Sequence, residues 1–245
     1  MNISLVIYCQ NPQSLPKIYE LTSAYAPFFS QCIILLNLSQ NTPIPPLYPP
    51  ELKRVSILRM PDKIDDGAAL NKFFPHLQCD RVLLIDSHAH IKKEIITVLR
   101  HWAEWDFERQ SCIVSFQPIV RCSRLHFPHR QGIEWRKSFR FVTTMNWGAI
   151  FFDHKFVLGL GAFDAQLSED ALMVDLSWRA QQSTGLLVET MQPYAVLKES
   201  YEPTALEWIV LNQKHPRYYP TWLSFFKRMA SKVFQSQTVL EQPLN

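Results

Sequence analysis

The stretch from Arg81 to Ile91, with the sequence RVLLIDSHAHI, constrains the fold of this chain more than any other stretch. The four consecutive apolar residues from Val82 to Ile85 are typical of a buried strand. Asp86 stands where that strand ends, and a carboxylate beside a sheet core is costly unless a cation or hydrogen-bond donors meet it. His88 and His90 follow, and their imidazoles supply metal-ligand chemistry. The stretch therefore predicts a site at the end of a central strand.

Other short apolar runs alternate with amphipathic segments along the chain. The runs indicate strands at 3–8, 32–36, 55–58, 112–116 and 147–152. Apolar residues at helical spacing indicate helices at 15–25, 65–74, 92–105 and 171–183. This alternation predicts an α/β fold with a mainly parallel sheet covered on both faces. Ligands of such sheets bind beyond the carboxyl ends of the strands, where Tyr8, Asn37 and Asp86 fall.

Composition excludes several classes of protein. A hydrophobic content of 47% and an aromatic content of 13% suffice for a sizeable core in 245 residues. A net charge of +3, without a basic run interleaved with aromatics, argues against a nucleic-acid partner. Five cysteines without a Cys-x-x-Cys pair favour a reduced, cytoplasmic protein. We expect neither a signal peptide nor a membrane span, because no apolar run approaches the roughly 20 residues that a span needs.

A series of motifs follows one another between roughly residues 3 and 216: Asn37-Leu38-Ser39, Gly67–Asn71, Leu84–His88, Trp147–Phe152, Gly161–Asp164, Asp175–Gly185 and Leu211–Pro216. Their order and spacing resemble those of the family-two glycosyltransferases of the GT-A fold. The resemblance implies an α/β/α sandwich with a mainly parallel mixed sheet. It places a transferase domain at residues 1–219, followed by an amphipathic helix and tail at 220–245.

The resemblance also implies a chemistry, in which a sugar leaves a nucleoside diphosphate and is attacked by an acceptor hydroxyl. A divalent cation, Mn²⁺ or Mg²⁺, neutralises the departing diphosphate, and a carboxylate takes the proton of the acceptor. The Asp-x-Asp motif of the family falls on Asp86 and His88, so these residues, with His215, are the expected metal ligands. Imidazole in the second position makes the site softer and less negative. The alternative is that Asp86 only bonds the sheet end and that His88 is a surface residue.

The remaining site residues follow from the same resemblance and from their places at strand ends and helix starts. The expected contacts of the nucleotide donor are Tyr8, Asn37, Asp65, Asp66, Asn71 and Asp86. The expected acceptor-side residues are Trp147, Gly148, Asp164 and Asp175. The alternative for Asp175 is a pair with Arg179, four residues later on the same helix face.

The catalytic base is the position where the chain departs most from the family. The acidic Glu-Asp pair of the family falls on Leu172 and Met173, which cannot accept a proton. Glu169 and Asp170 lie three residues earlier and are the candidate bases. Acidic residues at this position also suit the N-terminus of the helix that follows. The sequence therefore leaves two roles open for these two residues.

The expected function is an inverting, metal-assisted glycosyltransferase of bacterial cell-surface polysaccharide biosynthesis, with a glycan or lipid-linked glycan as acceptor. Residues 220–234 carry an apolar stripe with Lys227, Arg228 and Lys232 nearby, which suits either contact with the cytoplasmic face of a membrane or packing on the protein itself. The replaced acids motivate a second hypothesis, a degenerate protein that binds a nucleotide sugar without turnover. A third is a metal-dependent amidohydrolase, since Asp86–His90 resembles a DxHxH motif. Too few residues follow His90 for the roughly 250-residue barrel which that motif should open.

Overall fold

The computed structural model describes residues 2–44, 55–103, 111–116, 134–135, 139–142, 144–190, 192, 194–196 and 203–216. The chain divides into two compact units, residues 1–203 and residues 204–245. Within the described ranges, the second unit holds helix α6, Ala205–Lys214. The expected boundary after residue 219 stays a prediction, because residues 217–245, with the helix expected at 220–234, lie outside the described ranges.

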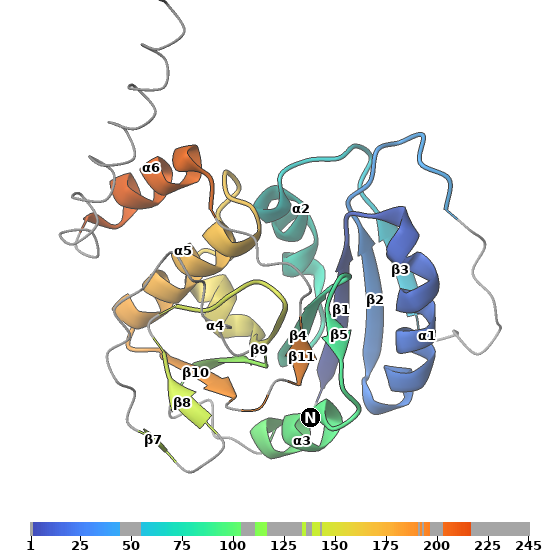
Figure 1. The fold of residues 1–245 in the computed structure, drawn as a ribbon, viewed down its shortest axis with the longest axis horizontal. Helices are drawn as coiled ribbons and strands as arrows, with labels where there is room; N and C mark the ends of the chain where they lie inside the picture. Colours follow the sequence, from blue (N-terminus) through green and yellow to red (C-terminus); the bar gives the residue numbers. More distant parts are fainter. Residues whose placement is uncertain are drawn as a thin grey trace, which may run out of the picture. The chain divides into compact units, whose positions relative to one another are not determined.

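Among the described residues, nine strands of the first unit form one sheet in the order β3-β2-β1-β4-β9-β6-β10-β8-β7 (Figure 1). Strands β3, β2, β1 and β4 run parallel to one another, and β6 and β10 run parallel to each other. Strand β9 is antiparallel to both β4 and β6, and β8 is antiparallel to β10. The sheet is therefore mixed and mainly parallel, as predicted. The strand bounds are β1 Ile3–Cys9, β2 Gln31–Leu36, β3 Val55–Arg59, β4 Arg81–Asp86, β6 Cys112–Ser115, β7 Glu134–Trp135, β8 Phe139–Phe141, β9 Ala149–Asp153 and β10 Leu186–Thr190.

The helices of the first unit confirm four predicted segments and add one. The predicted helices are α1 Leu15–Tyr25, α2 Asp66–Phe73, α3 Ile95–Ala103 and α5 Glu169–Gln182. Helix α4, His154–Gly159, was missed, and so was the small antiparallel pair of β5 (His90–Ile91) and β11 (Ala195–Val196). None of the helices in the described part of the chain is long and apolar enough to span a membrane.

Alternate residues of the central strands face two different helical layers, because side chains alternate across a strand. On one face, Ile7 of β1 belongs to a buried cluster with Ile18 of α1 and Leu99 of α3. On the other face, Phe74, which directly follows α2, stacks on Phe152 of β9 with 5.7 Å between ring centroids. Helices α1 and α3 therefore cover one face of the sheet and α2 covers the other. This layering is the α/β/α sandwich that the resemblance implied.

Candidate functional site

Three strands bring polar side chains to the carboxyl edge of the sheet. Tyr8 of β1 lies beside Asp86 of β4 in the register of the parallel pair. Asn37 follows β2 directly, and its backbone N–H donates to the carbonyl of Cys9 at 2.9 Å. The exposed fraction is 0% for Tyr8 and Asn37 and 5% for Asp86. The structure thus brings these side chains together where the sequence placed them, on the face that α2 covers.

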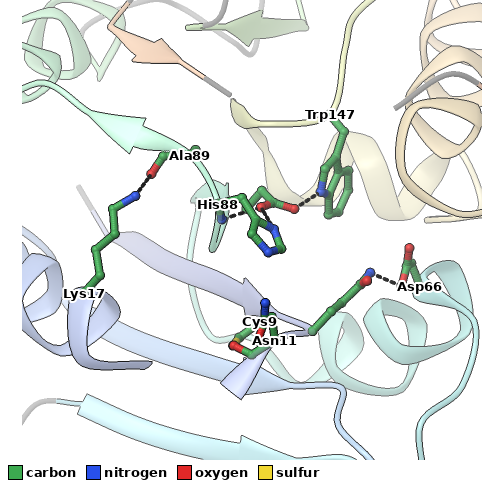
Figure 2. Close-up of polar contacts among 9 residues, drawn as sticks. Cys9, Asn11, Lys17, Asp66, His88, Ala89 and Trp147 are labelled. Carbon is green, nitrogen blue, oxygen red and sulfur yellow. Dashed lines mark hydrogen bonds and ion pairs between the residues drawn. The ribbon is translucent and has the colours of Figure 1, made fainter. Parts of the chain in front are cut away.

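Asp86 accepts hydrogen bonds on both oxygens of its carboxylate. Its Oδ1 accepts the backbone N–H of His88 at 2.6 Å and lies 3.0 Å from Nδ1 of the same residue. Its Oδ2 accepts the indole N–H of Trp147. The side chains of His88 and Trp147 converge on this carboxylate in Figure 2. The hydrogen bond with Asp86 raises the pKa of the His88 imidazole, although partial burial opposes that rise.

Two residues expected on the acceptor side, Trp147 and Gly148, contact Asp86 in this structure. Trp147 is 1% exposed, and the edge of its ring packs against Tyr8 with 5.7 Å between centroids. The carbonyl of Gly148 accepts the backbone N–H of Asp86 at 2.7 Å. Trp147 and Gly148 therefore fix the carboxylate and the backbone of Asp86, respectively.

A second buried carboxylate, Asp66 in the first turn of α2, lies on the same face. Its Oδ1 accepts the hydroxyl of Tyr8 at 2.6 Å and the side-chain amide of Gln10 at 2.5 Å, and its Oδ2 accepts the backbone N–H of Glu169 at 3.3 Å. The side-chain amide of Asn37 donates to the Tyr8 hydroxyl at 2.6 Å. Burial raises the pKa of Asp66, and the hydrogen bonds from Tyr8 and Glu169 oppose that rise. These expected donor-binding side chains thus bond to one another.

Gln10 and Lys17, to which no role was assigned from the sequence, also lie at this edge. Gln10 lies two residues after Tyr8, and residues i and i+2 of an extended chain face the same side. That spacing was the available signal for Gln10. Lys17 of α1 donates from Nζ to the carbonyl of Ala89 at 3.3 Å (Figure 2), and its charge lowers the pKa of His88 slightly against the larger effects. Both residues supply donors near the two carboxylates.

Helix α2 is attached to the loop that leads from α4 to α5. The side chain of Asn71 bonds both to the carbonyl of Phe163 at 2.5 Å and to its N–H at 2.9 Å. The N–H of Gly67 donates to the carbonyl of Leu167 at 3.2 Å. A Cβ atom at Gly67 would lie 1.8 Å from the carbonyl oxygen of Asp164, so only glycine allows this approach. Asn71, expected at the donor, has its polar atoms bonded to this loop.

The candidate bases stand where that loop enters α5. Glu169 is the first residue of α5 and has a φ of 46°, in the left-handed region. Its charge contributes to the raised pKa of His88, which places it within electrostatic reach of the strand end. The side chain of Asp170 lies outside the described part of the structure. Leu172 and Met173 are 0% and 1% exposed, in keeping with their apolar character.

The acidic residues expected near the acceptor make local contacts. Asp175 is 1% exposed and accepts the Nε–H of Arg179 at 2.8 Å. Arg179 also donates from Nη1 to the carbonyl of Leu160 at 2.7 Å, so the predicted helical pair is confirmed and joins α5 to the end of α4. Asp164 accepts the N–H of Gln166 at 3.0 Å and shapes the turn.

The remaining expected contacts lie at helix ends. Asp65 is exposed at the N-cap of α2 and makes no side-chain capping bond. His215 is the C-cap of α6 in the second unit and is 4% exposed. Its expected approach to Asp86 stays a prediction.

Asp86 and His88 are the side chains at the strand end that could bind a divalent cation. Among the described residues, no group of three or more His, Cys, Asp or Glu side chains could hold a metal ion. The side chains of Asp86 and His88 lie next to each other, but Oδ1 of Asp86 and Nδ1 of His88 already contact each other at 3.0 Å. Mg²⁺ commonly takes one or two carboxylates and completes its shell with water and substrate phosphates. The residues therefore suit a cation that arrives with a diphosphate, and do not form an all-protein site.

Comparison with solved structures identifies the fold. No family model matches the chain, and neither does any curated protein. The structure of GalNAc-T7 with UDP, GalNAc and Mn²⁺ matches 87% of this chain with a TM-score of 0.57 at 10% identity. TarS 1–349 of S. aureus matches 86% with a TM-score of 0.56 at 14% identity, and its complex with UDP-GlcNAc matches 83% with a TM-score of 0.53 at 15% identity.

The match is to part of each of those proteins. The chain spans 48% of the GalNAc-T7 structure and 60% to 63% of the two TarS structures. The first unit of this chain therefore has the fold of the GT-A glycosyltransferases.

Proposed function

We propose that this protein transfers a sugar from a nucleoside-diphosphate donor to a hydroxyl acceptor. The observation that carries the proposal is Asp86, a buried carboxylate held at the sheet edge by Trp147 and His88. Structures with this fold contain UDP and UDP-GlcNAc, which makes a uridine nucleotide the first donor to test. Ligands of open α/β sheets bind at this edge.

The diphosphate would meet His88 and Asp86 at the end of β4. The side chain of His88 is 35% exposed, so it can reach a ligand while its Nδ1 stays bonded to Asp86. An imidazolium donates hydrogen bonds to phosphate oxygens and balances charge on the leaving group. When His88 is neutral, a divalent cation held by Asp86 and His88 would, when bound, supply Lewis acidity at the same oxygens in place of the imidazolium.

The acceptor hydroxyl needs a general base. Among the carboxylates that the structure describes, Glu169 is our candidate for that role. It begins α5 and interacts electrostatically with His88. In an inverting transfer, this carboxylate accepts the proton as the hydroxyl attacks the anomeric carbon from the face opposite the diphosphate. Asp170 remains the alternative base. We propose a glycan or lipid-linked glycan as acceptor, reached at the cytoplasmic face of a membrane through residues 220–234.

Nucleotide binding without turnover is the second candidate function. Two observations favour it: Leu172 and Met173 are buried apolar residues where the family resemblance expected acids, and Tyr8, Asn37 and Asp66 bond to one another. Both candidate functions require nucleotide binding. An enzyme would then cleave the donor and transfer or release its sugar, whereas a binding protein would leave the donor intact.

Thermal unfolding in the presence of nucleotides tests both candidates. UDP and GDP are titrated with and without Mn²⁺, because a ligand of the folded state stabilises it by about 2.7 kcal/mol at 100 times its Kd. We expect a rise in Tm with one nucleotide, reduced in Asp86→Asn and retained in Asp62→Asn, where an exposed acid is changed instead. The absence of any shift would reject both functions. Release or transfer of labelled sugar then separates an enzyme from a binding protein.

A further inference from the structure

Two helix N-termini meet at the carboxylate of Asp66. Asp66 lies in the first turn of α2, and its Oδ2 accepts the N–H of Glu169, the first residue of α5. The N-terminal N–H groups of a helix have no partner within the helix and carry partial positive charge. Ser168, the N-cap of α5, makes no side-chain capping bond of its own. Asp66 therefore caps α5 from another helix.

The backbone of Glu169 adopts a conformation that needs such support. Its φ of 46° lies in the left-handed region, which costs a residue with a side chain about 1 kcal/mol or more. Non-glycine residues keep this conformation only where the surrounding structure holds them. Here the support comes from α2, through Gly67 to Leu167 and through Asp66 to Glu169 itself.

Asp66 is in turn held from the sheet side. The Tyr8 hydroxyl and the Gln10 amide both donate to its Oδ1, which leaves Oδ2 directed at Glu169. Asn37 holds the Tyr8 hydroxyl and also accepts the N–H of Ile64 at 3.0 Å. A continuous series of hydrogen bonds thus runs from the ends of β1 and β2 to the start of α5.

We propose that Asp66 is a positioning residue, which fixes the backbone of Glu169 and so directs the Glu169 carboxylate toward the acceptor, rather than a ligand of the nucleotide. This inference rests on the proposed function for the role of Glu169, but the contact itself does not depend on it. The buried carboxylate of Asp66 is 5% exposed and has partners on both oxygens, so it offers little to a ligand. Its neighbour Asp65 is exposed and makes no side-chain capping bond, so its carboxylate is better placed to contact a nucleotide from the solvent side.

The test compares Asp66→Asn with Asp62→Asn in the full chain, by amide hydrogen exchange, UDP titration and steady-state kinetics. An amide has one oxygen, and if that oxygen keeps the hydrogen bonds from Tyr8 and Gln10, its NH₂ group faces the N–H of Glu169, donor against donor. We expect the Glu169 amide to exchange at least about tenfold faster, because it loses a charge-assisted hydrogen bond. We expect kcat to fall about 100-fold, as for a catalytic group displaced by about 1 Å, while the Kd for UDP changes less than about twofold. Asp62→Asn should change none of the three quantities.

Two outcomes would overturn the proposal. A weaker Kd for UDP with an unchanged kcat would make Asp66 a donor ligand. A lower Tm with unchanged kcat and unchanged exchange at Glu169 would make its role purely structural.

A measurement on the wild-type protein keeps the test decisive if Asp66→Asn fails to fold. The proton chemical shift of the Glu169 amide should follow the ionisation of Asp66, whose other charged or titratable neighbours are Tyr8, Asp86 and Lys63. An amide shift that does not titrate with Asp66 would overturn the contact. A wild-type protein that transfers no sugar would instead reject the proposed function, and the exchange and amide measurements would still decide whether Asp66 holds Glu169.

Discussion

Asp86 shows how a single buried carboxylate can be held ready for a ligand. Hydrogen bonds from the His88 backbone and ring and from the Trp147 indole satisfy it, and the Gly148 carbonyl holds its own N–H. Bonds of this kind fix the direction of both oxygens. Because these bonds also hold the surrounding structure, removing the charge of Asp86 should lower the stability of the fold as well as change the site.

We therefore predict that Asp86→Asn lowers the free energy of unfolding by about 1.5–3 kcal/mol, the range for hydrogen bonds to charged groups. The amide cannot accept from the His88 N–H and the Trp147 indole with both of its heavy atoms. Urea denaturation measures the loss. Asp62→Asn, at an exposed acid, should stay within about 0.5 kcal/mol of wild type. Equal midpoints for the two variants would contradict the bonding described for Asp86.

His88 predicts a pH dependence of stability. Its pKa in the folded protein lies above the ordinary value of 6.5, chiefly because of the hydrogen bond with Asp86. The imidazolium therefore stabilises the fold fully below pH 6.5, and this contribution disappears as the pH rises through the raised pKa. The side chain is about one-third exposed, so solvent screening should keep the contribution below about 1 kcal/mol.

The measurement for His88 is the difference in unfolding free energy between wild type and His88→Gln, followed from pH 5.5 to pH 9 in steps of about 0.5. Groups common to both proteins cancel in this difference. It should be largest on the acid side and shrink toward alkaline pH. A difference that stays constant or grows with pH would show that the pair with Asp86 is not an ion pair.

At the scale of single residues, the sequence predicted where side chains lie better than what they touch. The strand end placed Asp86, Tyr8 and Asn37 correctly because parallel strands end at one edge. The bond from Tyr8 to Asp66 joins residues 58 positions apart, and the contact from Asp66 to Glu169 joins residues 103 apart. Such bonds depend on how α2 and α5 pack, which local patterns do not encode.

At the scale of elements, α2 acts as a support for the loop that enters α5. Asn71 bonds to Phe163, Gly67 to Leu167, and Asp66 to Glu169. The helix thus touches the loop at successive places from the turn after α4 to the start of α5. A shift of α2 should therefore move the candidate base.

Gly67→Ala tests this support. The added Cβ would lie 1.8 Å from the carbonyl oxygen of Asp164, so backbone must move. We expect a loss of about 1–3 kcal/mol in unfolding free energy, the usual cost of overpacking, together with a lower rate of the proposed sugar transfer. Gly159→Ala is the matched control, because nothing lies within 4 Å of the Cβ position there at the end of α4. A Gly67→Ala protein as stable as Gly159→Ala would contradict the close approach of α2.

The predicted elements have a clear helical period or a continuous apolar run. Helix α3 has the period, and strands β1, β2 and β4 are such runs. Helix α4 has six residues, too few for a helical period to emerge. Strand β10, with the sequence LLVET, has no alternation of apolar and polar residues. It is defined by its hydrogen-bonded pairing with β6 and β8.

At the scale of the whole molecule, the order of strands in the sheet is the part that the sequence could not supply. Alternation of strands and helices predicted parallel neighbours, and β3, β2, β1 and β4 follow that rule. Strand β9 then enters between β4 and β6 in the opposite direction. Its insertion brings Trp147 and Gly148, which directly precede β9, to Asp86, so the long-range topology completes the site.

The division of the chain into two units gives the last prediction. The hydrophobic cluster that contains Ile7, Ile18 and Leu99 draws its buried residues from 5 to 195, and β10 ends at Thr190, so this cluster and Asp86 both belong to residues 1–203. We therefore expect a chain shortened after Pro203 to unfold cooperatively and to keep the Tm shift caused by UDP alone.

His215 is absent from that chain, and the full-length variant His215→Gln isolates its effect. If His215 is a metal ligand, as the resemblance implies, both proteins should lose the extra shift caused by Mn²⁺ with UDP, since the folded state then binds the cation more weakly. A full Mn²⁺ effect in both would remove His215 from the site and leave the cation to Asp86, His88 and the diphosphate. Loss of the UDP shift itself in the shortened chain would show that residues after 203 contribute to the donor site.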